Sequence, residues 1–422
     1  MIKGKRFLLT HIWLRGFGGA ELNILELATF LQHQGAEVEV FTFLLLDPLA
    51  TEFKKRNIKV IDDFFHQFDV EDYDYVWSAQ NIIPTTMIQS LTQKQTKLPK
   101  FLFFHMAALP DYVLEQPYIH QLEEKLASAS LAISQEIIEL NLSRFSLDRE
   151  RILMYPNPAP DEYSAENYFA AKLEKIAVVS NHPPQEILEL RDKLAHKGIE
   201  VDYYGSWSDR YQLASPVLFA PYDCIIAIGK NVQYCLLMGK PIYIYDHFAG
   251  PGFLTAKNFS LAAKHNFSGR GFEGDIRTSD EIMEDLLENF SKAQLYHHRH
   301  LNEWRQSYSM SVVVRQVIDF LDEHPKNFEP LEQTYMNYVC SMNLLVKNSI
   351  VRLDNDVQSL WKQIFLNDTQ LENVQKEIAD LKQDLLEKKI ELDLIKVSRS
   401  YKFFSRLRKI RLAFTNYFKK RG

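Results

Sequence analysis

Short apolar runs alternate with longer amphipathic stretches from Arg6 to Tyr155. The runs have the length and the β-branched or aromatic content of strands, whereas Ala20–His33 has helical periodicity and is followed by Gly35. Strands that alternate with helices form parallel sheets covered on both faces. The strands predicted in this part are Arg6–Ile12, Val38–Leu46, Ile58–Ile61, Tyr75–Trp77, Phe101–Phe104, Leu131–Ile133 and Ile152–Tyr155.

The alternation stops at Pro156–Pro160, where prolines occupy three of five positions and break any regular element. It then resumes, which predicts a second α/β unit behind a linker. Two such units place a cleft between the carboxyl ends of their sheets, where open α/β folds bind ligands. The expected strands of the second unit are Ile176–Val179, Glu200–Tyr204, Cys224–Ile228 and Pro241–Tyr245, with helices at 184–196 and 232–238.

Beyond residue 330 the pattern changes to long helices with a heptad repeat. The repeat alternates steps of four and three residues, and only Asn367 and Lys388 are polar members. A period of 3.5 favours a supercoiled helix pair, so we expect self-association through 345–395. A long amphipathic helix packed on its own domain is the alternative. The seam consists of Leu360, Ile364, Asn367, Leu371, Val374, Ile378, Leu381, Leu385, Lys388, Leu392 and Ile395.

Charge divides the chain unevenly. The 422 residues carry a net charge of −6, yet ten basic and no acidic residues lie in 396–422, so the remainder carries −16. An acidic body argues against nucleic acid as a partner. In the tail, bases are mixed with Phe, Leu and Ile at near-helical intervals, which predicts an amphipathic segment on an anionic membrane surface. Nucleic-acid binding by the tail and docking on the acidic body are the alternatives.

Several protein classes are excluded by composition. No apolar run approaches the roughly 20 residues that span a bilayer, and the start of the chain lacks the pattern of a signal peptide. The cysteines Cys224, Cys235 and Cys340 have no CxxC spacing, so a reducing cytoplasm is expected. We interpret His297, His298 and His300 as a solvated helical surface and predict no metal and no cofactor.

A glycine-containing loop separates the first strand from the first helix. Gly18 and Gly19 allow a ligand to approach the backbone, and the helix start favours an anion, although a structural turn has the same composition. Three stretches together resemble family 4 glycosyltransferases over about 1–325. The stretches are Gly18–Glu21 with Leu25–Ala28 and Gly35–Val40, then Phe103–His105, then Ala132–Ser134 with Tyr155–Asn157.

The resemblance implies a GT-B arrangement: two Rossmann-like domains, the second of which binds a nucleotide sugar. It predicts an α/β chain with Rossmann-like domains at 1–157 and 158–328, a helical coiled coil at 329–395 and a basic amphipathic tail at 396–422. The family's Gly-Arg…Lys pair is replaced by Val179–Pro184, which contains Asn181. Its E-x7-E element is also absent, with Ile226 and Tyr234 at the two glutamate positions.

The residues suggest replacement contacts to the donor. Gly229, Lys230 and Asn231 run from a strand end into a helix, where free N–H groups and a lysine suit a diphosphate. An ordinary solvated lysine is the alternative. Asp246 and His247 follow a strand, in a loop that also contains Gly250 and Gly252. Such a loop faces the cleft and could contact a sugar, or its glycines serve conformation alone.

His105 and Glu21 are the catalytic candidates. The resemblance places His105 at the strand-end histidine of the family, and an imidazole can transfer a proton near neutral pH. A histidine bonded to a nearby carbonyl is the alternative. Glu21 is positioned to orient an acceptor hydroxyl, but the helix dipole also favours an acidic residue in a first turn.

We therefore expect a glycosyltransferase of hexosyltransferase type that uses a nucleotide sugar and a glycan or polyprenyl-linked acceptor in cell-surface polysaccharide synthesis. It is expected in the cytoplasm, peripheral at the inner face of the plasma membrane. The alternative is a catalytically silent subunit of the same fold whose coiled coil recruits an active partner.

Overall fold

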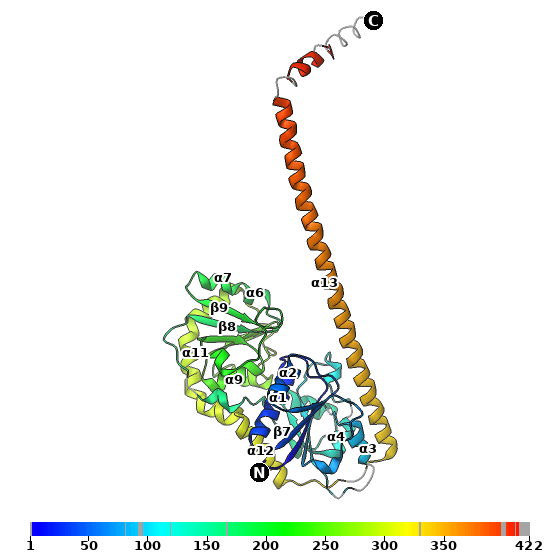
Figure 1. The fold of residues 1–422 in the computed structure, drawn as a ribbon. Helices are drawn as coiled ribbons and strands as arrows, with labels where there is room; N and C mark the ends of the chain where they lie inside the picture. The colour runs from blue at the N-terminus through cyan, green and yellow to red at the C-terminus, as the bar shows by residue number, and fades with distance from the viewer. Residues whose placement is uncertain are drawn as a thin grey trace. The chain divides into compact units, whose positions relative to one another are not determined.

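The computed structural model describes residues 2–80, 82–91, 95, 97–118, 120–165, 168–328, 331–397, 402–409 and 411–412. The chain divides into two compact units, Met1–Ile350 and Val351–Gly422. The first unit contains both predicted Rossmann-like domains, and Figure 1 shows a separate sheet in each of them. The α/β fold class predicted from the alternating pattern is confirmed.

The first sheet has seven strands in the order β3-β2-β1-β4-β5-β6-β7, and the neighbouring strands pair in parallel. Buried apolar residues line both faces, which accounts for the nearly continuous apolar runs. The strands are β1 (Arg6–His11), β2 (Glu37–Thr42), β3 (Lys59–Ile61), β4 (Tyr75–Ala79), β5 (Lys100–His105), β6 (Ala127–Ala132) and β7 (Ile152–Met154). The helices are α1 (Gly19–His33), α2 (Leu49–Lys55), α3 (Thr85–Ser90), α4 (His120–Leu126) and α5 (Gln135–Arg144), with 3-10 turns η1 (Val70–Asp72), η2 (Val113–Glu115) and η3 (Arg149–Arg151).

The second sheet has five strands in the order β12-β11-β10-β8-β9, and only its edge strand β12 is antiparallel. The prediction of a loop after β11 is wrong for residues 249–253, which form this edge strand. The strands are β8 (Lys175–Val179), β9 (Glu200–Tyr204), β10 (Cys224–Ala227), β11 (Ile242–Asp246) and β12 (Ala249–Phe253). The other elements are η4 (Asp161–Ser164), α6 (Gln185–Leu188), α7 (Leu190–Ala195), α8 (Pro216–Phe219), α9 (Lys230–Met238), α10 (Phe259–Lys264) and α11 (Ser279–Tyr308).

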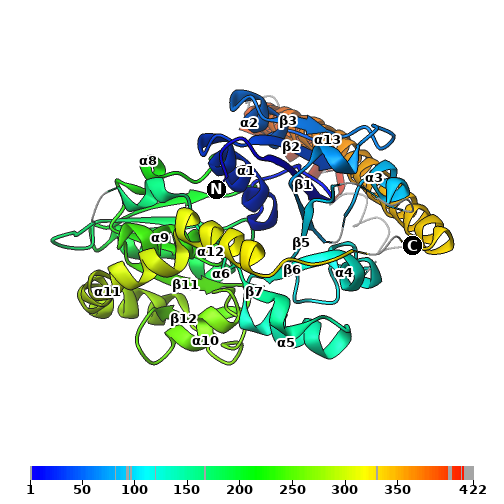
Figure 2. The same ribbon diagram turned by 90° about the horizontal axis from the view of Figure 1, so that it is seen from below.

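The helix α12 (Met310–Glu323) returns to the first domain, where Figure 2 shows it between α1 and β7 in projection. Its buried residues Met310, Val314 and Leu321 belong to the same apolar core as α1. The chain therefore passes between the domains twice, at Ala159 and again at Met310, and the N–H of Met310 donates to the carbonyl of Ala159 at 2.9 Å. The division into 1–157 and 158–328 did not anticipate this return.

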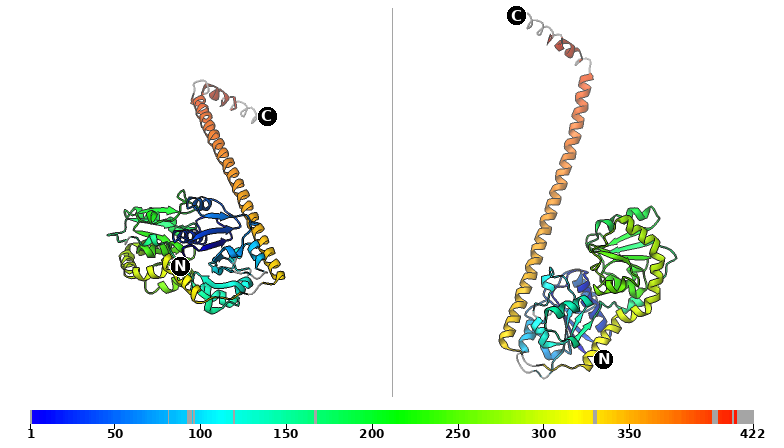
Figure 3. Two further views of the ribbon diagram at one scale, coloured as in Figure 1. Left: turned by 60° about the horizontal axis from the view of Figure 1, so that its bottom comes forward. Right: turned by 180° about the vertical axis from the view of Figure 1, so that it is seen from behind.

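The long helix α13 (Gln333–Val397) begins beside the first domain, as both views in Figure 3 show. Met336, Val339, Val346 and Ile350 are buried in the core on the face of the first sheet opposite α1. Asn343 is fully buried, and its side-chain amide donates to the carbonyl of Ile83 at 2.9 Å. The early part of the predicted coiled-coil segment is thus a helix packed on its own domain, and the exposed seam starts after Ile350.

Candidate functional site

A cleft of about 350 Å³ lies between the two domains. The loop before α1 and the start of α1 form one wall, and the ends of β8, β9, β10 and β11 form the other. This is the position that the two α/β patterns predicted. Of the site residues expected from sequence, the cleft is lined by Gly18, Gly19, Asn181, Gly229, Lys230, Asn231, Asp246 and His247; Glu21, His105, Gly250 and Gly252 are not among its lining residues.

The start of α9 faces the cleft because Gly229 turns the chain sharply. Gly229 has φ +59° and ψ −133°, a conformation that side chains other than glycine's rarely adopt. No atom lies within 4 Å of a Cβ built on it, so backbone angle rather than space requires the glycine. In the first turn the N–H of Val232 donates to the carbonyl of Gly229 at 2.9 Å. The N–H groups of Lys230 and Asn231 precede it at the helix start, a position that favours an anion.

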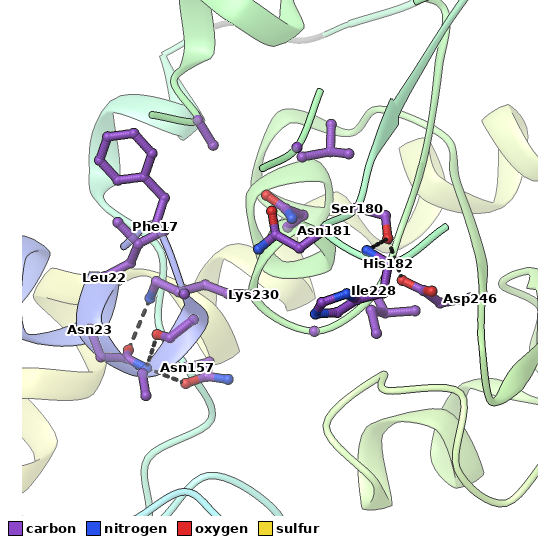
Figure 4. Close-up of a pocket in the computed structure, with 18 of the residues that line it drawn as sticks. Phe17, Leu22, Asn23, Asn157, Ser180, Asn181, His182, Ile228, Lys230 and Asp246 are labelled. Carbon is purple, nitrogen blue, oxygen red and sulfur yellow. Dashed lines mark hydrogen bonds between the residues drawn. The ribbon is translucent and has the colours of Figure 1, made fainter. Parts of the chain in front are cut away.

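Lys230 differs from its expected role. Its side chain is buried, and the ammonium Nζ lies 2.8 Å from Glu26 Oε2 on α1 and 2.9 Å from Asn23 Oδ1. Figure 4 shows the side chain turned toward Asn23, away from Asp246. Burial lowers the pKa of Lys230 and raises that of Glu26, and the attraction between them opposes both shifts. Lys230 was predicted to give its charge to a diphosphate, with a solvated lysine as the alternative; the structure instead pairs it with Glu26 across the two domains.

A chain of side-chain amides runs beside this pair. Asn23 Nδ2 donates to Asn157 Oδ1 at 2.6 Å, and Asn157 Nδ2 donates to Asn266 Oδ1 at 2.9 Å. The three residues come from the first domain, the linker and the second domain. Asn157 has φ +51°, a conformation that asparagine tolerates better than most residues. The linker is therefore bonded to both domains at the floor of the cleft.

Ion pairs and an aromatic contact also connect the domains away from this floor. Arg270 Nη2 lies 2.6 Å from Glu136 Oε2, and Lys264 Nζ lies 2.9 Å from Glu139 Oε2. The N–H of Phe17 donates to the hydroxyl of Tyr211 at 2.7 Å, and their rings are 5.1 Å apart. These contacts hold the two walls of the cleft at a defined separation.

Asp246 organises the polar groups on the second-domain wall. Ser180 Oγ donates to Asp246 Oδ2 at 2.8 Å, and the N–H of His182 donates to Ser180 Oγ at 3.0 Å. The ring of His247 places Nδ1 3.3 Å from Asp246 Oδ1, and it meets the ring of His182 edge to face. Asn181 accepts from the N–H of Ser206 at 3.0 Å and so fixes the loop after β9.

Gly250 and Gly252 have structural roles instead of lining the cleft. A Cβ on Gly250 would overlap the carbonyl of Ile244 on the neighbouring strand. Gly252 has φ +73°, and a Cβ there would lie 2.7 Å from Arg277 Nη1. The expectation that both line a donor site is corrected: the close pairing of β12 with β11 requires glycine at 250, and the positive φ requires it at 252.

An acidic group forms part of the first-domain wall. Glu115 lines the cleft, and the carboxylate of Glu21 folds over Gly18, so closely that a Cβ on this glycine would overlap it. Burial raises the pKa of Glu21 to about 7, although a backbone hydrogen bond and the charge of Arg15 act in the opposite direction. Burial also raises the pKa of Glu115. A carboxylate that titrates near neutrality beside the cleft can accept a proton.

His105 lies at the end of β5 but is bonded within the first domain. Its Nε2 is 2.8 Å from Glu123 Oε1, which also accepts from Ser130 Oγ at 2.5 Å. Only 5% of His105 and none of Glu123 is exposed. This geometry matches the alternative, a histidine bonded to a nearby group of its own domain, except that the partner is the Glu123 carboxylate and not a carbonyl.

The histidine cluster on α11 is only partly a surface. His297 is fully buried, which lowers its pKa to about 3, so the expectation of a solvated position is wrong for this residue. His298 is exposed. Within the described part of the chain, no group of three His, Cys, Asp or Glu side chains is placed to hold a metal ion.

Sequence reasoning missed Asn23, Glu26, Glu115, Asn157 as a cleft residue, and Asn266. The polar Asn23 and Glu26 lie on a largely apolar helix and were the available signal for the pair with Lys230. Asn157 was noted only as part of the linker. For Asn266 the sequence carries no signal that we can identify.

Comparison with known proteins supports the fold. A glycosyltransferase from Rickettsia africae ESF-5 is 13% identical, covers 77% of this chain and 99% of its own, and has a TM-score of 0.50. The glycosyltransferase of kitacinnamycin is also 13% identical, covering 76% and 100%, with a TM-score of 0.45. The lipopolysaccharide outer core galactosyltransferase WaaB is 13% identical, covering 75% and 99%, with a TM-score of 0.44.

No family model and no curated protein matches the sequence. The two-domain topology and the Rickettsia structure together show a GT-B fold. Membership of family 4 stays a prediction.

The buried pair gives a test of how the domains are joined. Lys230→Met leaves Glu26 buried without its partner and should reduce the free energy of unfolding by about 3–5 kcal/mol. Adding Glu26→Gln removes the orphaned charge and should recover most of this loss in urea unfolding. A single variant as stable as the unaltered chain would contradict the assignment.

The raised pKa of Glu21 predicts a pH-dependent stability. The folded state holds the proton of Glu21 more tightly than the unfolded state, in which the pKa is near 4.5. The free energy of unfolding should therefore fall as the pH rises from about 4.5 to 7. In Glu21→Gln, the drop in the free energy of unfolding from pH 5 to pH 8 should be smaller by about 2 kcal/mol than in the unaltered chain. Urea unfolding at both pH values measures it, with exposed Glu288→Gln as the control. Parallel pH profiles for all three proteins would refute it.

Proposed function

We propose that this chain is a glycosyltransferase of hexosyltransferase type that moves a sugar from a nucleotide diphosphate to a glycan or polyprenyl-linked acceptor in cell-surface polysaccharide synthesis. The observation that supports it most is the start of α9, which Gly229 turns into a cleft between two Rossmann-like domains. Helix starts stabilise phosphate groups, and a closed cleft can align two substrates. The nucleotide sugar is a substrate, and no further cofactor is proposed.

The donor is proposed to bind the second-domain wall. The N–H groups of Lys230 and Asn231 would hold the diphosphate, while Asp246 and His247 would contact the sugar. Asn181, which fixes the loop after β9, would form the side nearest the nucleoside. Gly19 on the opposite wall would let the backbone approach the transferred sugar, and Gly18 would hold the Glu21 carboxylate beside it.

Glu21 is proposed to accept the proton of the acceptor hydroxyl. As the hydroxyl oxygen bonds to the anomeric carbon of the donor, the bond from that carbon to the diphosphate oxygen breaks. The proton passes to the Glu21 carboxylate, and the departing diphosphate keeps the electron pair and is stabilised by the start of α9. We assign His105 no part in this step, because Glu123 holds its Nε2 inside the first domain.

A second function is favoured by the ion pair of Lys230. With this ammonium engaged by Glu26, the described residues that line the cleft include no other lysine for a diphosphate. A catalytically silent subunit of the same fold, which recruits an active partner through its coiled coil, would have no use for such a lysine. Nucleotide binding distinguishes the two functions.

The nucleotide test uses UDP-, GDP- and dTDP-sugars with the full chain. At 100 times its dissociation constant, the correct donor should stabilise the protein by about 2.7 kcal/mol and raise its melting temperature. His247→Ala and Asn181→Ala should weaken binding, whereas His298→Ala on the exposed face of α11 should not. Glu21→Gln should keep donor binding and lower the transfer rate about 10²- to 10⁴-fold. Absence of binding across the panel would favour the silent subunit.

The basic tail supports a proposed location at an anionic membrane, at the inner face of the plasma membrane. No described helix is long and apolar enough to cross a membrane. Residues 402–409 are helical, with Lys402, Arg406 and Lys409 on one face beside exposed Phe403 and Phe404. Such a helix can lie in the headgroup region.

Vesicle sedimentation tests this location. The chain should bind phosphatidylcholine vesicles that contain phosphatidylglycerol and should not bind phosphatidylcholine alone. Arg406→Glu with Lys409→Glu should weaken binding at least about 30-fold, since each base contributes about 1 kcal/mol. Lys197→Glu with Lys257→Glu changes the net charge equally on the exposed body and should have little effect. Equal losses for both double variants would point to net charge alone.

A further inference from the structure

We propose that residues 353–395 of α13 form a parallel, in-register coiled coil with a second copy of this chain. The proposal concerns the unit Val351–Gly422 and does not depend on the proposed activity. It names the partner, the number of strands and their direction, which the heptad repeat by itself leaves open.

The seam of this helix is exposed along its length. Eleven apolar side chains on this seam are between 45% and 69% exposed, a stripe that a lone helix leaves in water. Together with the polar Asn367 and Lys388 they follow alternating steps of four and three residues. Their spacing of 3.5 residues matches a left-handed supercoil. They are Leu353, Val357, Leu360, Ile364, Leu371, Val374, Ile378, Leu381, Leu385, Leu392 and Ile395.

The apolar residues of the seam do not by themselves select a number of strands. In heptad letters, position a holds Val357, Ile364, Leu371, Ile378, Leu385 and Leu392, and position d holds Leu353, Leu360, Val374, Leu381 and Ile395. Branched residues at a with leucine at d, the combination preferred by parallel dimers, occupy only some of these positions, so the proposed pair rests on the charged residues beside the seam.

Two polar residues, Asn367 and Lys388, also occupy d. In an in-register pair each Asn367 meets its own copy, so the two amides can bond to each other. Lys388 lies 3.5 Å from Asp384 on the same helix, which partly offsets the repulsion between its copies.

Charges beside the seam determine the direction. Acidic residues precede the seam at the g positions Glu377, Asp384 and Glu391, and lysines follow it at the e positions 382, 389 and 396. In a parallel pair, g of one helix faces the e residue five positions later on its partner, so each of these three acids meets a lysine. In an antiparallel pair g faces g and e faces e, which brings acid to acid and lysine to lysine.

The same pattern identifies the partner as a second copy. Over 377–396 each helix carries acids on one side of its seam and lysines on the other, so this part complements itself and needs no different sequence. Nearer the start of the seam, Asp354, Asp356 and Asp368 face no lysine in such a pair, so the charge pairing belongs to the last three heptads. All six charged side chains are exposed in the single chain. Asp384 and Lys396 lie within 3.5 Å of Lys388 and Asp393 on their own helix, and these exposed pairs can exchange partners when two helices meet.

Single cysteines test the direction. In the full chain, Leu360→Cys and Ile395→Cys lie near opposite ends of the seam, and each should form a disulfide-linked dimer by itself under mild oxidation. An antiparallel pair would cross-link only when the two variants are mixed, which would overturn the proposal. Lys376→Cys on the outer face is the control and should cross-link at least tenfold more slowly; the unaltered chain accounts for any background from Cys340.

Sedimentation equilibrium of the full chain tests the partner and the number of strands. The unaltered chain should have the mass of two copies, and a monomer or trimer would overturn the proposal. Replacing the lysines at 382, 389 and 396 by glutamate should weaken self-association at least tenfold. Adding lysine at 377, 384 and 391 should restore it, and failure to restore would contradict the charge pairing.

Discussion

Inside the first unit, the ammonium of Lys230 meets the carboxylate of Glu26 where the two Rossmann-like domains touch. Neither charge is stable in a dry environment without the other, so both are satisfied only when α1 and α9 stand at this distance. Those two helices start at the cleft, and their starts carry Gly18 and Gly19 on one wall and Asn231 on the other. The pair therefore determines the width of the space in which any ligand of this protein must fit.

A tyrosine completes this arrangement. The hydroxyl of Tyr234 donates to Glu26, and Tyr234 stands where the resemblance expects the second glutamate of E-x7-E. A glutamate there would place two carboxylates beside a single lysine, which the buried environment would penalise. The absence of the second glutamate and the ion pair of Lys230 are thus linked, because Tyr234 and Lys230 both contact Glu26.

The strands and most of the helices were predictable because their signals are local. Alternating apolar runs identified both sheets, and the prolines at 156–160 identified the linker. The return of α12 to the first domain was not predictable, since an apolar stripe shows that a helix is packed but not which core it packs on. Local pattern also identified the heptad seam but not the point where α13 leaves the first domain, because Val346 and Ile350 continue the same repeat while buried.

Site residues were predicted less well because their roles depend on distant partners. Gly229 was recognised from its position between a strand and a helix. Lys230 and His105 were assigned by chemical type, yet Glu26 and Glu123 decide what these side chains do. Gly250 was interpreted as a loop glycine, although it lies in β12, where the carbonyl of Ile244 on the neighbouring strand leaves no space for a side chain.

The amide chain through Asn23, Asn157 and Asn266 has a consequence for how the domains respond to salt. Dissolved ions screen the exposed pairs Lys264 with Glu139 and, less strongly, Arg270 with Glu136. Hydrogen bonds between neutral amides carry no net charge to screen. Rising ionic strength should therefore loosen the periphery of the domain contact first, while the linker keeps its attachment to both domains and acts as the pivot.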